Sequence, residues 1–544
     1  MNLLCFIDTN NDSIIYPIHS KYVYSIKNNK LIVNNNEQYL SNFYDKKNNV
    51  ELTAVIGKNG VGKTHLLNNF FDLSKGLYIF ENSKGERYWY GNKNHLELDN
   101  GIFKIEDKKE ITSKFILFSN SIEGNVLENR NNRYKLTTDV TTGTKLLKLS
   151  LTEMINKDNL AQISFVNSAN KKILNYLEKI MKVPKMVVLK MKFNYLINFN
   201  KEFHLKHFFK NDMEIIEDFL KTDEKINEIE NLFIFNAKIT YITRLLGEYS
   251  YEEVLEILKM FPVLISEFDE EALGADLTKR FLESLESLRE LNFDGAYLSP
   301  SREIHLSIKD NNKLFIESLK QETYIIFESI RWERISSGQY NYLNLFARLF
   351  KEKRNLEDNS LILLFDEIDL GLHPEWQRQW IEYVPKILGE IFKNVKIQIV
   401  FTTHSPLLLS DMRKIDVILL DIDKQEKIKI NEGFNSFATN IHELMSKSFF
   451  LEGGVIGEFA KNKINATFKM LSKEKQLSKI QEIEIKDILN QIGEPIIKNE
   501  LSRLFEKKIN SRYQLKDKQS EINDLEKRIE LLKREIENEK NNTK

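Results

Sequence analysis

The chain has almost no cysteine and almost no net charge. Cys5 is the only cysteine among 544 residues, which excludes a disulfide within the chain and fits a reducing compartment. Lysines and arginines number 79 against 80 aspartates and glutamates, so the formal net charge is −1. No overall field therefore draws the protein to nucleic acid or to a membrane, and any such partner must meet a local patch.

Two further absences concern membranes and export. No apolar run in the chain approaches the roughly 20 residues that cross a bilayer. The first residues, MNLLCFIDTNNDS, lack the basic region and the small-residue cleavage site of a signal peptide. We therefore expect a cytoplasmic protein without a membrane partner.

Length and residue pattern indicate several domains in an α/β protein. A chain of 544 residues exceeds what one hydrophobic core usually organises, and its 42% hydrophobic content is enough for a large globular core. We find no repeat of solenoid or propeller period. Changes in pattern predict a β-rich region at 1–130, a mainly helical one at 131–295, an α/β region at 296–430, a helical region at 431–512 and a short tail at 513–544.

The most informative stretch follows a short apolar run, Leu52–Ile56, which predicts a buried strand. The next eight residues match G-x-x-x-x-G-K-[ST], and the apolar spacing after them predicts a helix. They are Gly57, Lys58, Asn59, Gly60, Val61, Gly62, Lys63 and Thr64. Glycines let successive backbone N–H groups converge on phosphate oxygens, and the helix presents its positive end to the same anion. Lys63 would reach the β- and γ-phosphates of a nucleotide, and the Thr64 hydroxyl would bind Mg²⁺.

Two later apolar runs end in polar groups that suit a nucleotide site. Asp366 and Glu367 directly follow the run Leu361–Phe365. Asp366 would hold the Mg²⁺ shell, and Glu367 would orient or deprotonate the attacking water. His404 follows the run Ile397–Phe401 and would form a hydrogen bond with the γ-phosphate and the water. A structural Asp-Glu turn and a structural histidine are the alternative interpretations.

A second anion site is indicated before the apolar run Leu361–Phe365. Ser336, Ser337, Gly338 and Gln339 precede an amphipathic helix predicted over residues 340–350. Small residues at a helix N-terminus leave its backbone N–H groups accessible to an anion. Taken alone, these four common residues indicate very little.

Four motifs follow one another along the chain: GKNGVGKT, ISSGQ, LILLFDEID and TTHS. Their types and order resemble those of an ABC-type ATPase head of the SMC and OLD-like branch. The resemblance covers residues 1–130 and 296–425. It implies an α/β fold, with a mixed β-sheet core that contains the P-loop, a largely helical insertion and a helical C-terminal extension. It also implies that two heads dimerise head to tail. ATP and Mg²⁺ would lie between Gly57–Thr64 of one copy and Ser336–Gln339 of the other.

Two further site residues come from the same resemblance. Asp369 matches the D-loop, which crosses the dimer interface in this family. The family's Q-loop glutamine has no clear equivalent here. Asn120 lies at the expected strand end, after the apolar run at 114–119, and is the substitute metal ligand that we assign.

The C-terminal part suggests a biological setting. Residues 437–512 resemble the helical part of ATPases paired with HNH nucleases, as in the Septu system, either stand-alone or attached to a retron. The resemblance implies an ATP-hydrolysing regulatory subunit of an anti-phage complex that controls a separately encoded HNH nuclease. A retron reverse transcriptase and its msDNA would be further partners. We expect no intrinsic nuclease, because the D-x-D at 421–423 precedes Glu452, whereas a TOPRIM nuclease domain needs it afterwards.

Two alternatives stay open from the sequence. Residues 171–210 hold ten lysines and only two acids, which fits either a solvated face or a nucleic-acid-binding surface. In the second case the chain would be an SMC-like DNA-repair or recombination ATPase that clamps nucleic acid directly. The tail spaces Leu515, Ile522, Leu525, Ile529, Leu532 and Ile536 as a short coiled-coil seam that Lys518 interrupts. A single amphipathic helix that docks on its own chain fits the same spacing.

Overall fold

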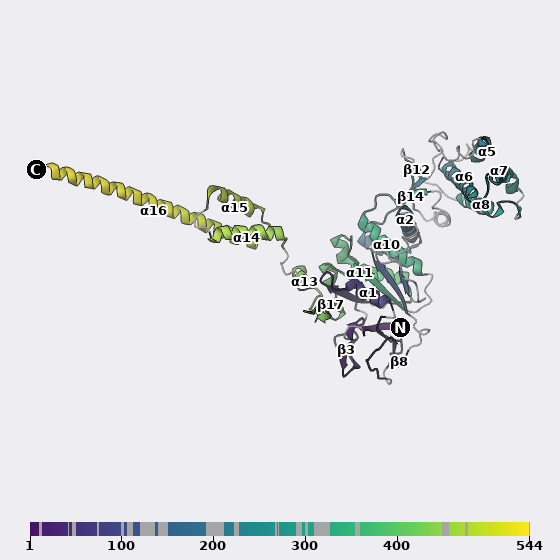
Figure 1. The fold of residues 1–544 in the computed structure, drawn as a ribbon, viewed down its shortest axis with the longest axis horizontal. Coiled ribbons are helices and arrows are strands. Elements are labelled where there is room, and N and C mark those ends of the chain that lie inside the picture. Colours follow the sequence, from purple (N-terminus) through teal and green to yellow (C-terminus); the bar gives the residue numbers. More distant parts are fainter. Residues whose placement is uncertain are drawn as a thin grey trace. The chain divides into compact units, whose positions relative to one another are not determined.

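The fold is described from a computed structural model of the chain. The structure describes residues 1–9, 13–41, 43–45, 50–72, 75–99, 103–105, 113–119, 137–139, 151–191, 211–221, 228–266, 269, 271–289, 296–299, 303–308, 327–353, 360–425, 427–431, 433–448, 456–473 and 477–542. It divides into two compact units, Met1–Phe450 and Leu451–Lys544 (Figure 1). Each unit is described by itself.

A seven-stranded sheet forms the centre of the first unit. Every neighbouring pair is parallel except the edge pair β17–β18. The order across the sheet is β10 (Thr137–Asp139), β9 (Ser113–Ser119), β15 (Ser360–Asp366), β16 (Lys396–Thr402), β5 (Val50–Gly57), β17 (Val417–Ile422) and β18 (Ile428–Asn431). Because parallel strands end at the same edge, the carboxyl ends of β9, β15, β16 and β5 lie next to one another there.

Alternate residues of the central strands pack into two different cores. In β15, Leu361, Leu363 and Phe365 join the larger core, whereas Ile362 and Leu364 join the smaller one. The larger core contains helices α2 (Leu151–Ser168), α3 (Lys171–Ile180), α10 (Ser337–Glu352) and α11 (Pro374–Ile391). The smaller core contains α1 (Lys63–Phe71) and parts of an N-terminal sheet. The central sheet is therefore buried on both faces, which explains its almost uniformly apolar strands and confirms the α/β class.

The N-terminal sheet has the order β2 (Ile14–Pro17), β1 (Asn2–Asp8), β6 (Leu77–Glu81), β7 (Arg87–Gly91) and β8 (Phe103–Ile105), and β3 (Tyr22–Lys27) and β4 (Lys30–Asn35) form a separate hairpin. Gln398 of β16 links this sheet to the central one. Its amide oxygen accepts from the N–H of Leu3 at 2.7 Å, and its amide nitrogen donates to the carbonyl of Leu3 at 2.9 Å. The buried Gln398 side chain thus pairs with both backbone groups of Leu3, as a neighbouring strand would.

The described part of the segment at 131–295 contains helices, strand β10 of the central sheet and one strand of a third sheet. That sheet has the order β12 (Tyr297–Leu298), β13 (Glu303–Ser307), β11 (Met186–Met191) and β14 (Phe327–Trp332). Strand β11 therefore comes from the predicted insertion, whereas its partners β13 and β14 follow it in the chain. Its described residues also form helices α5 (Met213–Leu220), α6 (Glu228–Glu248), α7 (Tyr251–Ser266) and α8 (Ala275–Arg289).

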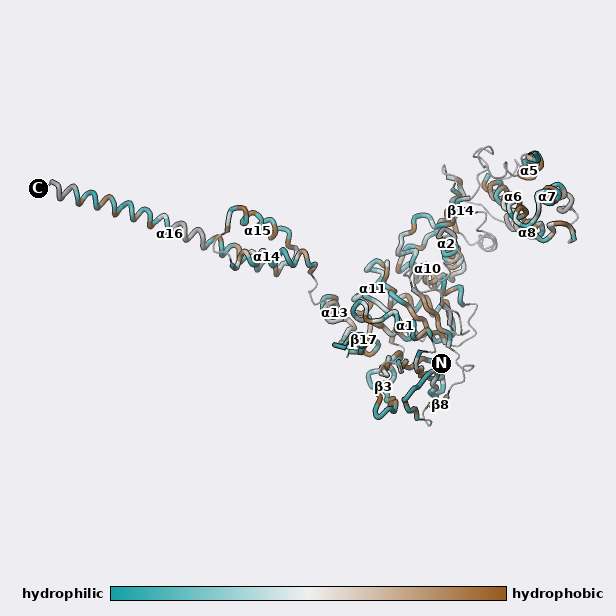
Figure 2. Tube along the Cα trace, viewed as in Figure 1, coloured by the Kyte–Doolittle hydropathy of each residue, from teal (hydrophilic) through white to brown (hydrophobic). Residues whose placement is uncertain are grey.

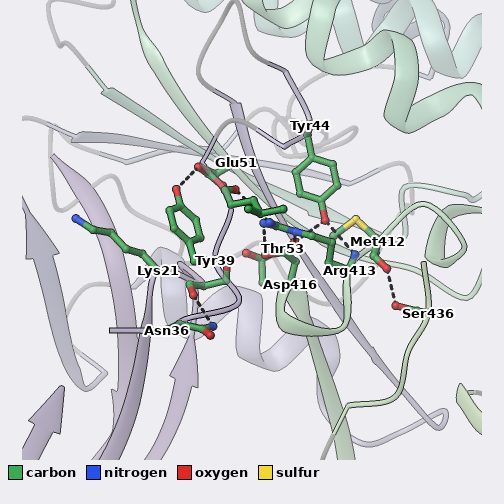
Figure 3. A network of polar contacts seen from close by, with 12 residues as sticks. Lys21, Asn36, Tyr39, Tyr44, Glu51, Thr53, Met412, Arg413, Asp416 and Ser436 are labelled. Carbon is green, nitrogen blue, oxygen red and sulfur yellow. Dashed lines mark hydrogen bonds and ion pairs between the residues drawn. The ribbon is translucent and has the colours of Figure 1, made fainter. Parts of the chain in front are cut away.

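A buried arginine connects the N-terminal region to the end of the second lobe (Figure 3). Arg413 follows α12 (Pro406–Leu409) and donates to Asp416 Oδ2 at 2.6 Å and to the carbonyl of Leu40 at 3.1 Å. The Tyr44 hydroxyl donates to the same oxygen of Asp416 at 2.6 Å. Burial opposes the charge of Arg413, but the hydrogen bond and charge of Asp416 prevail and raise the pKa of the guanidinium. The local ion pair of Arg413 with Asp416 thus accepts and donates hydrogen bonds that join it to residues about 370 positions earlier, Leu40 and Tyr44.

Among the described residues of the second unit are three helices, α14 (Glu458–Lys473), α15 (Lys479–Gln491) and α16 (Pro495–Asn542). They follow α13 (Ile441–Ser448), which belongs to the first unit. Its small core contains Leu471, Leu477, Ile485, Leu489, Leu501 and Phe505. Helix α16 has 48 residues and is therefore about 72 Å long at 1.5 Å per residue. Throughout the described residues, every helix is too short or too polar to cross a membrane.

Candidate active site

The glycine-rich loop lies between β5 and α1, as its sequence predicts. A Cβ atom on Gly57 would lie 2.5 Å from the carbonyl oxygen of Leu420, so only glycine allows this approach to β17. Gly62 caps α1 with a φ of 94°, a left-handed conformation that side chains disfavour. The two glycines thus give the loop the tight curvature that turns backbone N–H groups towards an anion.

Lys63 folds back over its own loop. Its ammonium donates to the carbonyls of Gly57 at 3.1 Å and of Lys58 at 3.0 Å, and the residue is only 8% exposed. Burial lowers the pKa of Lys63, and the nearby carboxylates of Glu367, Asp366 and Asp369 oppose that shift. The Lys63 side chain therefore lies at the carboxyl edge of the sheet, held by two carbonyls and close to three carboxylates.

Thr64 and Asp366 meet although they lie 302 positions apart. The Thr64 hydroxyl donates to Asp366 Oδ2 at 2.8 Å, and Asp366 is almost completely buried at the end of β15. Mg²⁺ binds oxygen ligands octahedrally at about 2.1 Å, so two adjacent ligands lie about 3 Å apart. The separation and the chemistry of these two oxygens therefore fit a magnesium ion that both would hold.

Glu367 is the next residue, and it has an unusual backbone. Its φ is 49°, in the left-handed region that costs a residue with a side chain about 1–3 kcal/mol. The turn is held on one side by the N–H of Leu370, which donates to the carbonyl of Glu367 at 3.0 Å. Such strain at the end of a buried strand is common where a side chain is aimed for function.

Thr402 is a site residue that the sequence interpretation missed. As the last residue of β16, it donates from its hydroxyl to Asp366 Oδ1 at 2.6 Å and accepts from the N–H of Glu367 at 2.7 Å. Strands β15 and β16 pair with Phe365 opposite Phe401, so the residues that follow lie side by side. The available signal was a threonine directly after the apolar residues Ile399, Val400 and Phe401.

Asp369 and His404 are also brought together. Asp369 Oδ1 accepts from the Thr403 hydroxyl at 2.6 Å and from the backbone N–H of His404 at 3.2 Å. Burial lowers the pKa of the His404 imidazole and the charge of Lys63 lowers it further, against Asp369 and Asp366. The imidazole is therefore neutral at neutral pH, when it can both donate and accept a hydrogen bond.

Gln377 and Ser405 extend this arrangement into α11. The Ser405 hydroxyl donates to the Gln377 side-chain oxygen at 2.7 Å. The Gln377 amide in turn donates to the carbonyls of Leu372 at 2.9 Å and of Asp369 at 3.4 Å. Neither polar residue was singled out from the sequence, because each is ordinary on the surface of a helix or loop.

The segment Ser336–Gln339 lies at the start of α10, with a different set of neighbours. Ser336 caps the helix: it accepts from the N–H of Gln339 at 3.2 Å, and the Gln339 side chain accepts in return from the N–H of Ser336 at 2.9 Å. A Cβ atom on Gly338 would lie 2.4 Å from the Trp376 ring, so this glycine is required by packing. Ser336 and Ser337 are exposed, and the helix N-terminus is therefore accessible.

Two further predictions fall partly outside the described residues. Asn120 lies outside them, although its neighbour Ser119 is described and stands opposite Asp366 in the pairing of β9 with β15. The second part of the basic segment, residues 192–210, also lies outside them. Within its described part, Lys190 forms an ion pair with Glu328 at 2.7 Å, which neutralises one of its lysines.

Comparisons with known proteins find two relatives of limited extent. The chain is similar to the Septu protein PtuA of Bacillus thuringiensis, with 29% identity over 136 residues, which are 22% of this chain and 33% of that protein. It is also similar to the Retron Ec83 probable ATPase of Escherichia coli, with 40% identity over 80 residues, which are 13% of this chain and 14% of that protein. Both matches span well under two thirds of the relatives' lengths.

A family model covers more of the chain. The family described as "AAA domain, putative AbiEii toxin, Type IV TA system" matches residues 52–410, from the strand before the glycine-rich loop to the segment after His404. This range contains Thr64, Asp366 and Thr402, whose side chains the fold brings into contact. Since the match extends over more than half of the sequence, the chain belongs to this AAA domain family.

Proposed function

We propose that this protein is an ATPase that binds ATP·Mg²⁺ at Gly57–Thr64 and hydrolyses it to ADP and phosphate. The observation that carries the proposal is the hydrogen-bonded series Thr64–Asp366–Thr402, with the strained Glu367 attached to its end. This series joins the glycine-rich loop to the two strand ends at which a magnesium ligand and a base are needed. Family membership and both relatives support the same activity.

The proposed roles follow from the positions of the side chains. Lys63 exchanges the carbonyls of Gly57 and Lys58 for phosphate oxygens, which attract an ammonium more strongly because they are charged. Magnesium bound to Thr64 and Asp366 would neutralise charge on the phosphates. Glu367 then orients the attacking water and accepts its proton, and the neutral His404 forms a hydrogen bond with the γ-phosphate.

We propose further that two copies complete each site head to tail. The accessible N-terminus of α10, with Ser336 and Ser337 exposed, supports this arrangement, since backbone N–H groups at such an end bind anions. In the proposed dimer Ser336–Gln339 of one copy covers the γ-phosphate held by Gly57–Thr64 of the other. Asp369 would then act close to the interface, where its carboxylate already fixes the backbone of His404.

Mixing two inactive variants tests the composite site. Lys63→Ala removes phosphate binding, whereas Ser337→Glu places a carboxylate against the partner's phosphates without disturbing a helix start that favours acids. If the sites are shared, an equimolar mixture regains about a quarter of wild-type turnover, because half of the dimers are mixed and each has one intact site of two. A mixture that stays as inactive as its components would contradict the head-to-tail dimer.

We also propose that the ATPase is the regulatory subunit of an anti-phage complex. It would control a separately encoded nuclease, in our expectation of the HNH type, with a retron reverse transcriptase and its msDNA as further candidate partners. The similarity to proteins named for the Septu and retron systems supports this setting. Affinity purification of the chain expressed with its neighbouring genes should retain the nuclease. Full nuclease activity in the purified chain alone would contradict the proposal.

A further inference from the structure

The end of helix α16 carries an apolar stripe outside the core of its unit. That core reaches Phe505 with its packed neighbour Ile509, and the helix continues to Asn542. Beyond it, the hydrophobic side chains at the seam positions are between 46% and 57% exposed: Ile522, Leu525, Ile529, Leu532 and Ile536. Figure 2 shows hydrophobic positions recurring along this helix among hydrophilic ones.

The spacing of this stripe identifies the kind of occupant. The five residues follow one another at intervals of three, four, three and four, which places them at alternating a and d positions of a heptad repeat. Side chains at such positions insert between those of a second helix with the same repeat. The ion pair between Arg534 and Glu530 lies at positions f and b, away from the stripe. The apolar side of the helix is therefore the side that suits a partner helix.

The charges beside the stripe fit a second copy of the same helix. Position e is occupied by Glu526 and then Lys533, and position g by Glu521, Arg528 and Glu535. Each side of the stripe therefore alternates in sign from one heptad to the next. A parallel pair brings each g residue to the e residue five positions later in the other copy, which sets Arg528 beside Lys533 and Glu521 beside Glu526. Like charges across the seam oppose this orientation.

An antiparallel pair avoids the repulsion. With Ile529 across from Leu532 of a second copy, Leu525 faces Ile536, and four layers of Ile and Leu form the seam. In this orientation g residues meet g residues and e residues meet e residues. Arg528 then lies beside Glu535, and Glu526 beside Lys533, each offset along the axis by two residues or about 3 Å. Every pair among these four charges is attractive, and each occurs twice by symmetry.

We propose that the tail of α16 pairs with the tail of a second copy as an antiparallel coiled coil. The pairing goes beyond the ATP-dependent contact between heads and needs no nucleotide. It joins the second units of two chains end to end, because the two Pro495 positions would lie about 100 Å apart along the paired helices. The tail thus supplies a second, nucleotide-independent contact between copies.

Sedimentation of the full-length chain without nucleotide tests the stripe. Leu532→Asp should weaken self-association at least about tenfold, since it buries an unpaired carboxylate in the seam. Leu531→Asp is the matched control, because Leu531 is the neighbouring residue, is 61% exposed and lies off the stripe. It should leave the association constant unchanged. A monomeric wild-type chain, or equal effects of the two variants, would overturn the proposal.

The orientation has its own tests. Arg528→Glu should weaken association about fivefold if the helices are antiparallel, whereas in a parallel pair it would strengthen association by placing a carboxylate beside Lys533. Arg534→Glu, on the outer face, should have no effect. Cys5 is fully buried, so a spin label attached to Asn510→Cys marks a single accessible site. Two such labels should lie about 65 Å apart, and a distance of about 20 Å would show a parallel pair and refute the inference.

Discussion

The substitution Thr402→Val tests whether the site is organised around the threonine at the end of β16. Valine has nearly the same shape, so the buried position keeps its packing and loses only the hydroxyl. That hydroxyl makes two hydrogen bonds, to Asp366 Oδ1 at 2.6 Å and from the N–H of Glu367 at 2.7 Å. The variant therefore removes the contact that joins the proposed magnesium ligand to the proposed base.

The expected cost follows from the two bonds. A hydrogen bond to a charged group contributes about 1.5–3 kcal/mol, and an unsatisfied buried N–H costs about 1–3 kcal/mol. Water entering the site would offset part of this, so we expect the free energy of unfolding to fall by about 3 kcal/mol. The backbone of Glu367 is strained, with a φ of 49°, and its N–H donates to Thr402. Without this hydrogen bond the backbone can relax and move the Glu367 carboxylate, so kcat should fall at least about tenfold.

The assay combines chemical denaturation with steady-state ATP hydrolysis at several Mg²⁺ concentrations. Thr402→Ser is the matched control, because it keeps the hydroxyl and loses only a methyl group, worth about 1 kcal/mol. We expect the serine variant to retain most of kcat and the valine variant to need more Mg²⁺ for half-maximal rate. A valine variant with wild-type kcat, or a serine variant as slow as valine, would refute the assigned role.

Three further predictions concern the same unit. Lys63→Ala should abolish ATP binding in calorimetry, whereas Glu367→Gln should bind ATP and accumulate it unhydrolysed in the head-to-tail contact; wild-type turnover in Glu367→Gln would disprove the base assignment. Gly338→Ala should cost about 1–3 kcal/mol of stability by overpacking against Trp376, read from a shifted denaturation midpoint, whereas Gly247→Ala, at a helical position of α6 where the added carbon meets nothing within 4 Å, is the control for the backbone change alone and should not lower stability. Burial lowers the pKa of His19 from 6.5 to about 4, so its contribution to stability is fully present above pH 6.5 and is lost as the pH falls towards 4. Replacing His19 with Gln should therefore flatten the pH dependence in this window by up to about 3 kcal/mol in urea titrations, and an unchanged slope would contradict the shift.

Local pattern was enough to find the strands that end at the site. The mostly apolar runs at Leu52–Ile56, Leu361–Phe365 and Ile397–Phe401 correspond to β5, β15 and β16, because strands buried on both faces are predominantly apolar. The position of polar residues after each run then followed from the common edge of a parallel sheet. Sequence pattern therefore predicted which strand ends meet at this edge, and the catalytic roles assigned to Glu367 and His404 stay predictions.

Non-local pairing was beyond the reach of the sequence. Strand β11 lies within a segment that reads as a helical insertion, yet its partners are β13 and β14, more than 110 positions later. Thr402 has a common side chain, and its importance comes only from its register beside Asp366. Such roles depend on which strand lies alongside, and no pattern within one segment contains that information.

The contacts within one chain also join the two halves of the composite site that we propose. Gly338, at the start of α10, approaches the ring of Trp376 at the beginning of α11. The next residue, Gln377, bonds the carbonyl of Asp369, whose carboxylate holds the backbone of His404. A nucleotide bound by the partner at Ser336–Gln339 would therefore press on the same helix that positions the histidine of this chain's own site. Helix α11 contacts both sites, through Trp376 and through Gln377. It is therefore the element whose movement would couple them.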